Sequence, residues 1–492
     1  MPAKLILINN CMKDLVGHYY ETAVSVADAA RAKGLIPILA THADCPTNII
    51  PDWLDSYPIL CIHHWLGDHP PRTPPAIRGH RADPYSQQNC TIAAVRSGQM
   101  SIEDYIRAYI ELPEGQPAAD ETLTAQSMRN PVERPLVEET KRMLEMVGCG
   151  DDLEPALMFK RDLERLLSLT GYNSEDHVYL ATAHARDLLG VALFVCRAGS
   201  ERAPTFHLEY RHSLFESPNW QIDADSEYLR LHRAYFTSYR NCGLSPRIRF
   251  YTDTEELAEE CRFVAGFDFS VLPIPFRSHA IANKPKDPAQ PLCFSYFGEA
   301  RDEKGFHWLA DTVDQLMDGY IRPGKIRFVL QATMGPMGNR QPQSAVSIAR
   351  LLRHPRKYVK LVGLEGPLSM EEYYAMVSES DAVLCPYHAY RYRNSSSGTL
   401  MEAIVAGKPT IVPSTGWLSR QQPPGSGGRF VDQASFIEAV KQLCDQFQSY
   451  KCVAERYSSL FRLTHSPERL VARILQKEAS PPAMTFAQRI AA

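Results

Sequence analysis

Short hydrophobic runs alternate with longer amphipathic stretches over most of the 492-residue chain. A run rich in β-branched and aromatic residues between turn residues predicts a strand, and apolar residues at helical spacing predict a helix. The alternation is typical of an α/β fold, in which helices cover parallel sheets. The expected strands are residues 4–10, 35–41, 57–65, 177–183, 204–210, 247–253 and 269–275 in the first half, and residues 292–298, 326–333, 359–363, 381–387 and 410–414 in the second.

The pattern predicts two doubly wound parallel sheets, each in a Rossmann-like domain of its own. The polar, proline-containing segment 277–291 separates the two series of strands and reads as a linker. We therefore expect an N-terminal domain over residues 1–276 and a C-terminal domain over residues 292–477. The second domain should end in two or three helices after residue 430, and residues 478–492 should form a tail.

One region interrupts the alternation. Residues 66–134 are rich in proline and polar residues around a single helical pattern at residues 101–112. A long irregular insertion in a compact domain is usually functional or disordered. We favour a lid or a partner-binding surface over disorder.

Composition excludes several classes of protein. The 53 basic and 57 acidic residues nearly balance, so nucleic acid is not an expected partner. The twelve cysteines form no CxxC pair, as expected for free thiols in a reducing compartment. No signal peptide is apparent, and the longest apolar run, residues 188–196, is too short to cross a bilayer. We expect a soluble cytoplasmic protein.

The histidine-rich stretch 63–69 resembles a set of metal ligands, but we expect no metal, because adjacent residues of an extended chain point to opposite faces.

Residues 392–414 contain the most informative pattern. They read as a polar loop and an apolar helix with one acid, Glu402, before the next strand. Ligands of open α/β sheets bind beyond the carboxyl ends of the strands, and the free N–H groups of a helix N-terminus suit a phosphate or a diphosphate. The residues expected to bind such a ligand are Asn394, Ser395, Ser396, Ser397, Gly398, Thr399 and Glu402.

Glu402 has two interpretations. Thr399 and Glu402 have the spacing of a capping box, in which the acid only caps its own helix. Against this, the helix is apolar on all sides but one and should be buried, and a buried carboxylate needs hydrogen-bond donors, which the hydroxyls of a sugar would provide.

Two other segments add candidate residues. Residues 297–306 follow the first strand of the second domain and place Arg301 and Lys304 where a helix begins, so these cations can neutralise a diphosphate leaving group. Their alternative interpretation is a pair of solvated charges in a first helical turn. In the first domain, Gly17 follows the first strand at a turn, which by itself is weak evidence.

Together these segments resemble the GT-B glycosyltransferases, and most closely glycosyltransferase family 4. The resemblance lies in "VGHYYETAVSVADAARAKG", "VLPIP", "GEARDEKG" and "NSSSGTLMEAIVAGKPTIV". It implies two Rossmann-like domains that face a central cleft. It also implies transfer of a sugar from a nucleotide-diphosphate donor to an acceptor hydroxyl, with retention, without a metal and with no cofactor besides the donor substrate. The acceptor, whether a glycan, a lipid or a small molecule, stays open.

The resemblance assigns roles to three residues. Glu402 matches the acid that binds the ribose of the nucleotide, Lys304 matches the lysine that meets the diphosphate, and Gly17 matches the glycine that faces the donor phosphates. The chain departs from the family where Asn394 replaces a sugar-binding Glu. It departs again where Glu299 replaces an Arg, with Arg301 as a possible substitute two positions later.

Two histidines of the first domain, His184 and His207, follow or lie within strand patterns and are candidates to contact the sugar from that side. Each has the alternative of a structural role. Two other functions stay open: a nucleotide-sugar epimerase or hydrolase of the same fold, and a catalytically silent glycosyltransferase-like protein that binds or scaffolds. The departures at Asn394 and Glu299 motivate the silent alternative.

Overall fold

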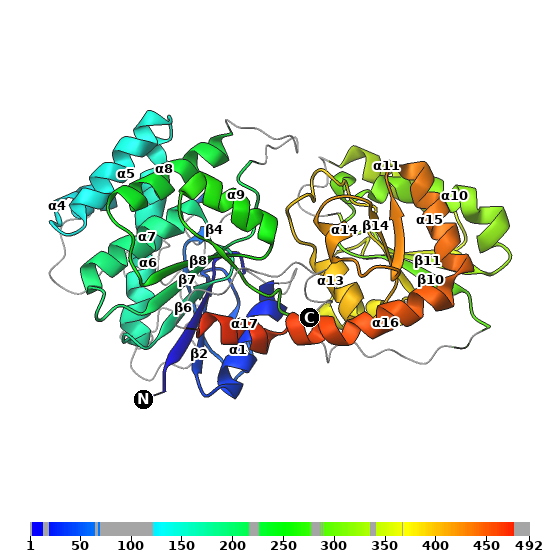
Figure 1. Cartoon of the computed structure of the whole chain (residues 1–492), viewed down its shortest axis with the longest axis horizontal. Coiled ribbons are helices and arrows are strands. Elements are labelled where there is room, and N and C mark those ends of the chain that lie inside the picture. Colours follow the sequence, from blue (N-terminus) through cyan, green and yellow to red (C-terminus); the bar gives the residue numbers. More distant parts are fainter. Residues whose placement is uncertain are drawn as a thin grey trace, which may run out of the picture. The chain divides into compact units, whose positions relative to one another are not determined.

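The computed structural model describes residues 2–12, 19–63, 67–68, 122–215, 226–276, 287, 289–334, 341–366 and 368–476. These residues form two compact units that divide between Leu272 and Pro273, and the chain from Val471 returns to the first unit. In Figure 1 the first unit runs in colour from blue to green, and the second from green through yellow to red.

The first unit is built on a sheet of seven parallel strands in the order β3-β2-β1-β6-β7-β8-β9. Strand order increases outward from β1 on one side and from β6 on the other, which is the doubly wound arrangement. The strands are β1 Lys4–Asn9, β2 Ile36–His42, β3 Asp55–Leu60, β6 His177–Leu180, β7 Thr205–Tyr210, β8 Ile248–Thr252 and β9 Ser270–Val271. A separate antiparallel pair is formed by β4 Ile62–His63 and β5 Gly67–Asp68.

The second unit repeats this plan with six parallel strands in the order β12-β11-β10-β13-β14-β15. The strands are β10 Leu292–Tyr296, β11 Ile326–Gln331, β12 Val359–Val362, β13 Ala382–Leu384, β14 Thr410–Pro413 and β15 Gly427–Phe430. The strands of both sheets are largely hydrophobic in sequence because helices cover both faces of each sheet.

Helices connect the strands in both units. Since strand-to-strand crossovers are right-handed, helices that belong to the two halves of a doubly wound sheet cover opposite faces. Accordingly α6, α7 and α8 lie together in Figure 1, whereas α1 lies with β2. The helices of the first unit are α1 Tyr19–Ala32, α4 Leu123–Arg129, α5 Arg134–Met146, α6 Leu153–Thr170, α7 Ala185–Ala198, α8 Glu227–Asn241 and α9 Glu255–Ala265. Those of the second are α10 Leu309–Leu316, α11 Pro342–Leu351, α12 Met370–Glu379, α13 Gly398–Val405, α14 Trp417–Gln421, α15 Gln433–Asp445 and α16 Phe447–Thr464, and α17 Pro467–Ile474 crosses the boundary at Val471.

The predicted fold class, two doubly wound parallel-sheet α/β domains, is confirmed. Every predicted strand has a counterpart within a few residues of its expected bounds, and three helices follow residue 430 as expected. Strand β15 was not predicted, because its sequence "GGRF" lacks the β-branched residues that mark a strand. The domain boundaries, linker and tail stay predictions, and residues 478–492 lie outside the described residues.

The predicted irregular region needs one correction. Its last part is helical, because α4 begins at Leu123 and α5 at Arg134. The Thr122 hydroxyl caps α4, and the Glu154 carboxylate accepts hydrogen bonds from Leu123 N and Thr124 N. Glu154, which is distant in the sequence, therefore satisfies N–H groups at the start of α4 that have no partner within the helix. The helical pattern at 101–112 and most of the insertion lie outside the described residues.

Two further sequence expectations concern membranes and thiols. Among the described helices, none combines the length and apolar character needed to cross a membrane. The cysteines of the described residues carry free thiols.

A buried polar ladder crosses the centre of the first sheet. His177 Nδ1 lies 3.0 Å from His207 Nε2, and His207 Nδ1 lies 3.1 Å from the Tyr251 hydroxyl. His207 is fully buried, so desolvation lowers the pKa of both histidines, and charge on His177 lowers that of His207 further. The folded state therefore holds His207 neutral, whereas the unfolded chain binds a proton below the ordinary histidine pKa of 6.5.

His207→Gln is expected to make the free energy of unfolding less dependent on pH. In the wild type, stability is lost as the pH falls below 6.5, by up to about 1.4 kcal/mol per pH unit for each excluded proton. The variant has no imidazole at residue 207, so its unfolded chain takes up one proton fewer as the pH falls. Urea unfolding at several pH values between about 5 and 7.5 measures the difference in slope.

Tyr251→Phe serves as the control, since it removes a hydrogen bond of the ladder but no histidine. It is expected to lower stability at every pH without a change in slope. Equal slopes for the wild type and His207→Gln would contradict a neutral His207 in the folded state.

Candidate functional site

The second sheet has its switch point between β10 and β13, and the loops that follow these strands carry most of the predicted site residues. Residues 297–304 follow β10, and residues 385–397 lead from β13 into α13. Strand order reverses between two neighbouring parallel strands here, so their loops diverge and leave room for a ligand. The predicted residues of these two loops therefore lie at the carboxyl edge of the sheet of the second unit.

Gly298 brings the two loops together. Its φ of +93° favours glycine, and a Cβ there would lie 2.9 Å from Lys304 Nζ and 3.9 Å from Thr399 Oγ1. The Lys304 ammonium and the first turn of α13 thus lie within 4 Å of one point. Gln331 at the end of β11 holds this glycine, because its side-chain oxygen accepts a hydrogen bond of 2.7 Å from Gly298 N.

A second glycine makes an even closer approach. Gly305 has a φ of +70°, and a Cβ at this residue would lie 1.8 Å from the Pro386 carbonyl oxygen. No residue with a side chain fits there. His388 N also donates a 3.0 Å hydrogen bond to the Glu303 carbonyl. The loop after β10 and the loop after β13 are therefore locked through their backbones.

Lys304 is the cation that this arrangement leaves unpaired. Within the described part of the chain its ammonium makes no hydrogen bond or ion pair, and it lies 5.7 Å from the centre of the Tyr387 ring. Burial and repulsion by Arg301 lower the pKa of Lys304 to about 7. An anion at this point would supply the missing partner and favour the charged form.

Arg301 is already paired. Its Nη1 lies 3.2 Å from Glu303 Oε1, and its Nε lies 3.5 Å from Glu299 Oε2. Glu303 is buried, whereas Glu299 is exposed to solvent. The positive charge expected of Arg301 is thus balanced by two carboxylates from its own loop.

Glu402 does not cap its own helix, so the capping-box interpretation is wrong. The N-cap of α13 is Ser397, whose hydroxyl accepts a 3.3 Å hydrogen bond from Leu400 N. Glu402 lies one turn further along and accepts a hydrogen bond from the hydroxyl of Tyr373. Tyr373 comes from α12, and its ring packs edge-on against Phe297 at 5.5 Å between centroids.

The polar loop before α13 lies at the same edge. Ser395 is buried and accepts a 3.3 Å hydrogen bond from Arg391 Nη1, while Asn394 and Ser396 are partly buried. Gly398 and Thr399 form the first turn of α13. The positive end of the α13 dipole thus faces the same edge as the Lys304 ammonium.

Among the described residues of the first unit, the predicted site residues form no comparable cluster. Gly17 lies outside the described residues. His184 caps α7, since its Nδ1 accepts from Arg186 N and its own N–H donates to Asp187 at 2.8 Å. His207 lies fully enclosed in its sheet, in the structural role that was its alternative interpretation. The proposed contact of His184 with the sugar stays a prediction.

Sequence reasoning missed three residues that shape the site: Tyr373, Gln331 and Glu303. Tyr373 and Gln331 lie on elements 29 and 33 residues from the groups they hold, so no local pattern connects them. Glu303 was visible between Arg301 and Lys304, and the alternation of charges in "EARDEK" was the available signal.

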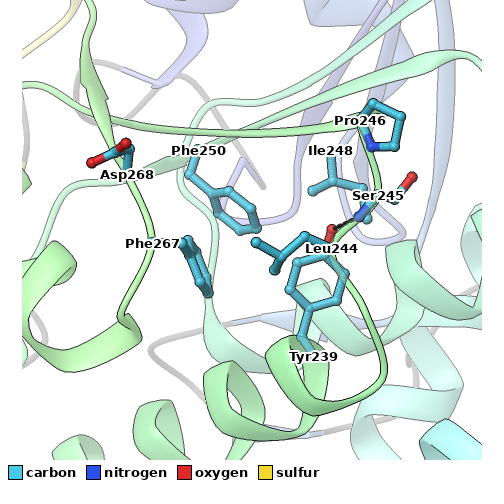
Figure 2. Close-up of a pocket in the computed structure, with 8 residues that line it drawn as sticks. All are labelled: Tyr239, Leu244, Ser245, Pro246, Ile248, Phe250, Phe267 and Asp268. Carbon is cyan, nitrogen blue, oxygen red and sulfur yellow. Dashed lines mark hydrogen bonds between the residues drawn. The ribbon is translucent and has the colours of Figure 1, made fainter.

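A cavity of about 380 Å³ lies elsewhere, in the first unit. Figure 2 shows the rings of Tyr239, Phe250 and Phe267 around it, with Tyr239 accepting a hydrogen bond from Ser245 N. The residues that precede β8 line it, so it lies at the amino end of that strand and not at the carboxyl end. Asp268 is its one charged group, so its lining is unsuited to a phosphate.

No metal centre appears in the described residues, where no cluster of three or more His, Cys, Asp or Glu side chains has the geometry to hold an ion. Most of the stretch 63–69 lies outside the described side chains. The expectation of a metal-free site stays a prediction.

Solved structures with the same fold span nearly the whole chain. A sucrose-phosphate synthase from Thermosynechococcus elongatus matches with a TM-score of 0.55 and 12% identity, over 96% of this chain and 97% of the other. HepE from Anabaena, in complex with UDP, matches with a TM-score of 0.53 and 12% identity, over 99% of both chains. The N-terminal domain of a Candida albicans trehalose-6-phosphate phosphatase matches with a TM-score of 0.56 and 10% identity, over 97% and 98%.

These likenesses show that the chain has the GT-B fold, as the sequence predicted. At 10–12% identity they show the fold alone. No family model and no curated protein matches the chain. The central cleft that the resemblance implies stays a prediction.

Tyr373→Phe and Glu402→Gln are each expected to lower the free energy of unfolding by about 1 to 3 kcal/mol, because the first removes the donor of this hydrogen bond and the second replaces the charged acceptor by a neutral one. The double variant should lose little more than the worse single variant, since both changes act on the same interaction. Urea unfolding of the four proteins gives the coupling energy.

Tyr358→Phe is the matched control, because the Tyr358 hydroxyl makes no hydrogen bond in the described part of the chain. It should leave stability nearly unchanged. Strictly additive losses in the double variant would show that Tyr373 does not hold Glu402.

Proposed function

We propose that this chain is a glycosyltransferase that takes a sugar from a nucleotide-diphosphate donor and transfers it to an acceptor hydroxyl. The observation that carries the proposal is the unpaired ammonium of Lys304 beside Thr399, in the first turn of α13, at the switch point of the second sheet. A lysine, helix N–H groups and small hydroxyl side chains at one point suit a diphosphate. HepE, a protein of the same fold, has been solved with UDP-glucose.

In this proposal each group of the site has one task. Lys304 and the N–H groups of Gly398 and Thr399 stabilise the negative charge that develops on the departing diphosphate. Such preorganised electrostatic stabilisation is usually a large part of catalysis. Glu402, held by Tyr373, accepts hydrogen bonds from the ribose hydroxyls, and Asn394 hydrogen-bonds the sugar as a neutral group.

The finer features come from the family resemblance. On that ground the proposal includes membership of glycosyltransferase family 4, a hexosyl donor, retention and independence of metals. It also includes a cytoplasmic location, which the composition of the chain suggested. The acceptor would bind to the first unit. Partly exposed groups at the carboxyl end of its sheet, such as His184, are the candidates there.

The deciding experiment is a thermal-shift screen with UDP, GDP and ADP and their sugars, followed by an assay of donor consumption with and without acceptors. A ligand that binds only the native state stabilises it by about 2.7 kcal/mol at a hundred times its Kd. We expect one nucleotide series to raise the melting temperature and the donor to be consumed only when an acceptor is present.

Two variants make the screen specific to the site. Lys304→Ala should cut turnover about 100-fold, because it removes a charge that acts on the leaving group. Glu402→Gln should weaken binding of ribonucleotides more than of their 2′,3′-dideoxy forms. Consumption without acceptor would indicate an epimerase or hydrolase, and binding without turnover over a wide acceptor panel would indicate the silent protein. Absence of binding to any nucleotide would overturn the proposal.

The pKa of Lys304 predicts how nucleotide affinity depends on pH. In the free protein the pKa is about 7, and a bound diphosphate should raise it. Binding above pH 7 therefore takes up a proton, and affinity should fall about tenfold per pH unit until the pKa of the complex is reached. Calorimetry between about pH 7.5 and 8.5, in buffers of different ionisation enthalpy, measures both the affinity and the proton uptake.

Lys304→Arg provides the comparison, since arginine keeps its charge throughout this range. Its affinity for the nucleotide should be independent of pH. A wild type whose affinity shows no pH dependence would contradict the assignment of Lys304 to the diphosphate.

A further inference from the structure

We propose that Glu299 is a built-in competitor for the anion site: its carboxylate neutralises Arg301 in the free protein and has to be displaced by the diphosphate, so that Glu299 limits the affinity for the donor. This inference rests on the proposed function and adds to it the residue that tunes ligand binding.

The geometry around Arg301 supports this inference. The guanidinium lies between two carboxylates that differ in exposure: the Glu303 side chain is 4% exposed and that of Glu299 is 39% exposed. Glu303 is therefore a fixed counter-ion inside the fold, whereas Glu299 reaches Arg301 from the solvent side. Because the Glu299 side chain is partly exposed, water can solvate its carboxylate once it leaves Arg301, and this lowers the cost of separating the pair.

A hydrogen-bond donor of Arg301 supports the inference as well. Arg301 Nε is buried and has no hydrogen-bond acceptor in the described part of the chain, since Glu299 Oε2 stays 3.5 Å away. A buried donor without an acceptor is unfavourable. Glu299 thus balances the charge of Arg301 without satisfying its donor, and a phosphate oxygen would do both.

Hydrogen bonds fix the backbone of Glu299, so it cannot move away from Arg301. Its carbonyl accepts hydrogen bonds of 2.9 Å from both Arg301 N and the Tyr296 hydroxyl, and the next residue, Ala300, donates to Thr333 O at 2.9 Å. Only the side chain is able to rotate away. Displacement therefore exchanges one counter-ion for another without a rearrangement of the loop.

Charge balance gives the consequence. The loop after β10 carries two cations, Arg301 and Lys304, and three acids, Glu299, Asp302 and Glu303, so its formal charge is −1. A diphosphate carries at least two negative charges, and a loop of net negative charge does not attract it. Removal of the Glu299 charge makes the loop neutral and leaves Glu303 as the remaining counter-ion of Arg301, which should favour the anion.

The test is calorimetric titration of the wild type and Glu299→Gln with two probes: the nucleoside diphosphate found in the screen, and inorganic pyrophosphate. Glutamine keeps the length of the side chain and removes its charge. We expect Glu299→Gln to bind both probes about five- to tenfold more tightly, with a steeper loss of affinity as salt is added.

Glu438→Gln is the matched control. Glu438 is an exposed acid of the same unit, ion-paired to Lys441 on α15, and its removal changes the net charge by the same amount. It should leave both affinities unchanged. In a Lys304→Ala background the gain from Glu299→Gln should persist, because Arg301 is the cation that Glu299 neutralises.

Each outcome of these titrations supports or overturns the competitor role of Glu299. Equal or weaker binding of both probes by Glu299→Gln, with an unchanged melting temperature of the free protein, overturns the competitor role while the proposed function stands. Tighter binding of pyrophosphate without binding of any nucleotide supports the competitor role and overturns the proposed function. An equal gain in Glu438→Gln would show only a general effect of charge and would overturn this inference.

Discussion

The candidate site depends on the close backbone contact between Gly305 and the Pro386 carbonyl. A Cβ at Gly305 would lie 1.8 Å from that oxygen, so only glycine permits the two loops to meet. This contact holds the loop after β10 against the loop after β13, which are the two loops at the switch point of the sheet. Lys304 precedes Gly305 directly, so the contact also determines where its ammonium lies.

The same constraint brings polar groups from several elements to one edge of the sheet. Helices α12 and α13 supply the Tyr373 hydroxyl and the Glu402 carboxylate from one side. The loop after β10 supplies its charges from the other. Rigid helices and strands hold these groups, and a site supported in this way needs little reorganisation when a charged ligand binds.

The charge balance of this loop distinguishes the chain from the family that it resembles. Glu299 replaces an arginine of the family pattern, and the structure places its carboxylate beside Arg301. With an arginine at this position the formal charge of the loop would be +1, whereas with Glu299 it is −1. The fold is therefore compatible with different strengths of anion binding, which are set by side chains at one edge of the sheet and not by the scaffold.

The sequence by itself determined the elements and their order. Hydrophobic runs, turn residues and helical periods are local signals, so they located both parallel sheets and the helix that begins after the serine-rich loop. Their positions after strands, together with the family resemblance, assigned Lys304 and the 394–402 segment to one site, and the structure brings Lys304 and Thr399 together. These local signals did not predict β15, because its two glycines have little strand preference and the strand forms by pairing with β14.

Only the tertiary structure decided what each polar side chain does. The local pattern allowed Glu402 to cap α13, but Ser397 caps it and Tyr373 binds Glu402 from α12. The pattern likewise presented Arg301 as a free cation, although Glu299 and Glu303 neutralise it. Hydrogen bonds and ion pairs depend on distances of a few ångström between groups far apart in the chain, and these distances exist only after the strands have paired and the loops have met.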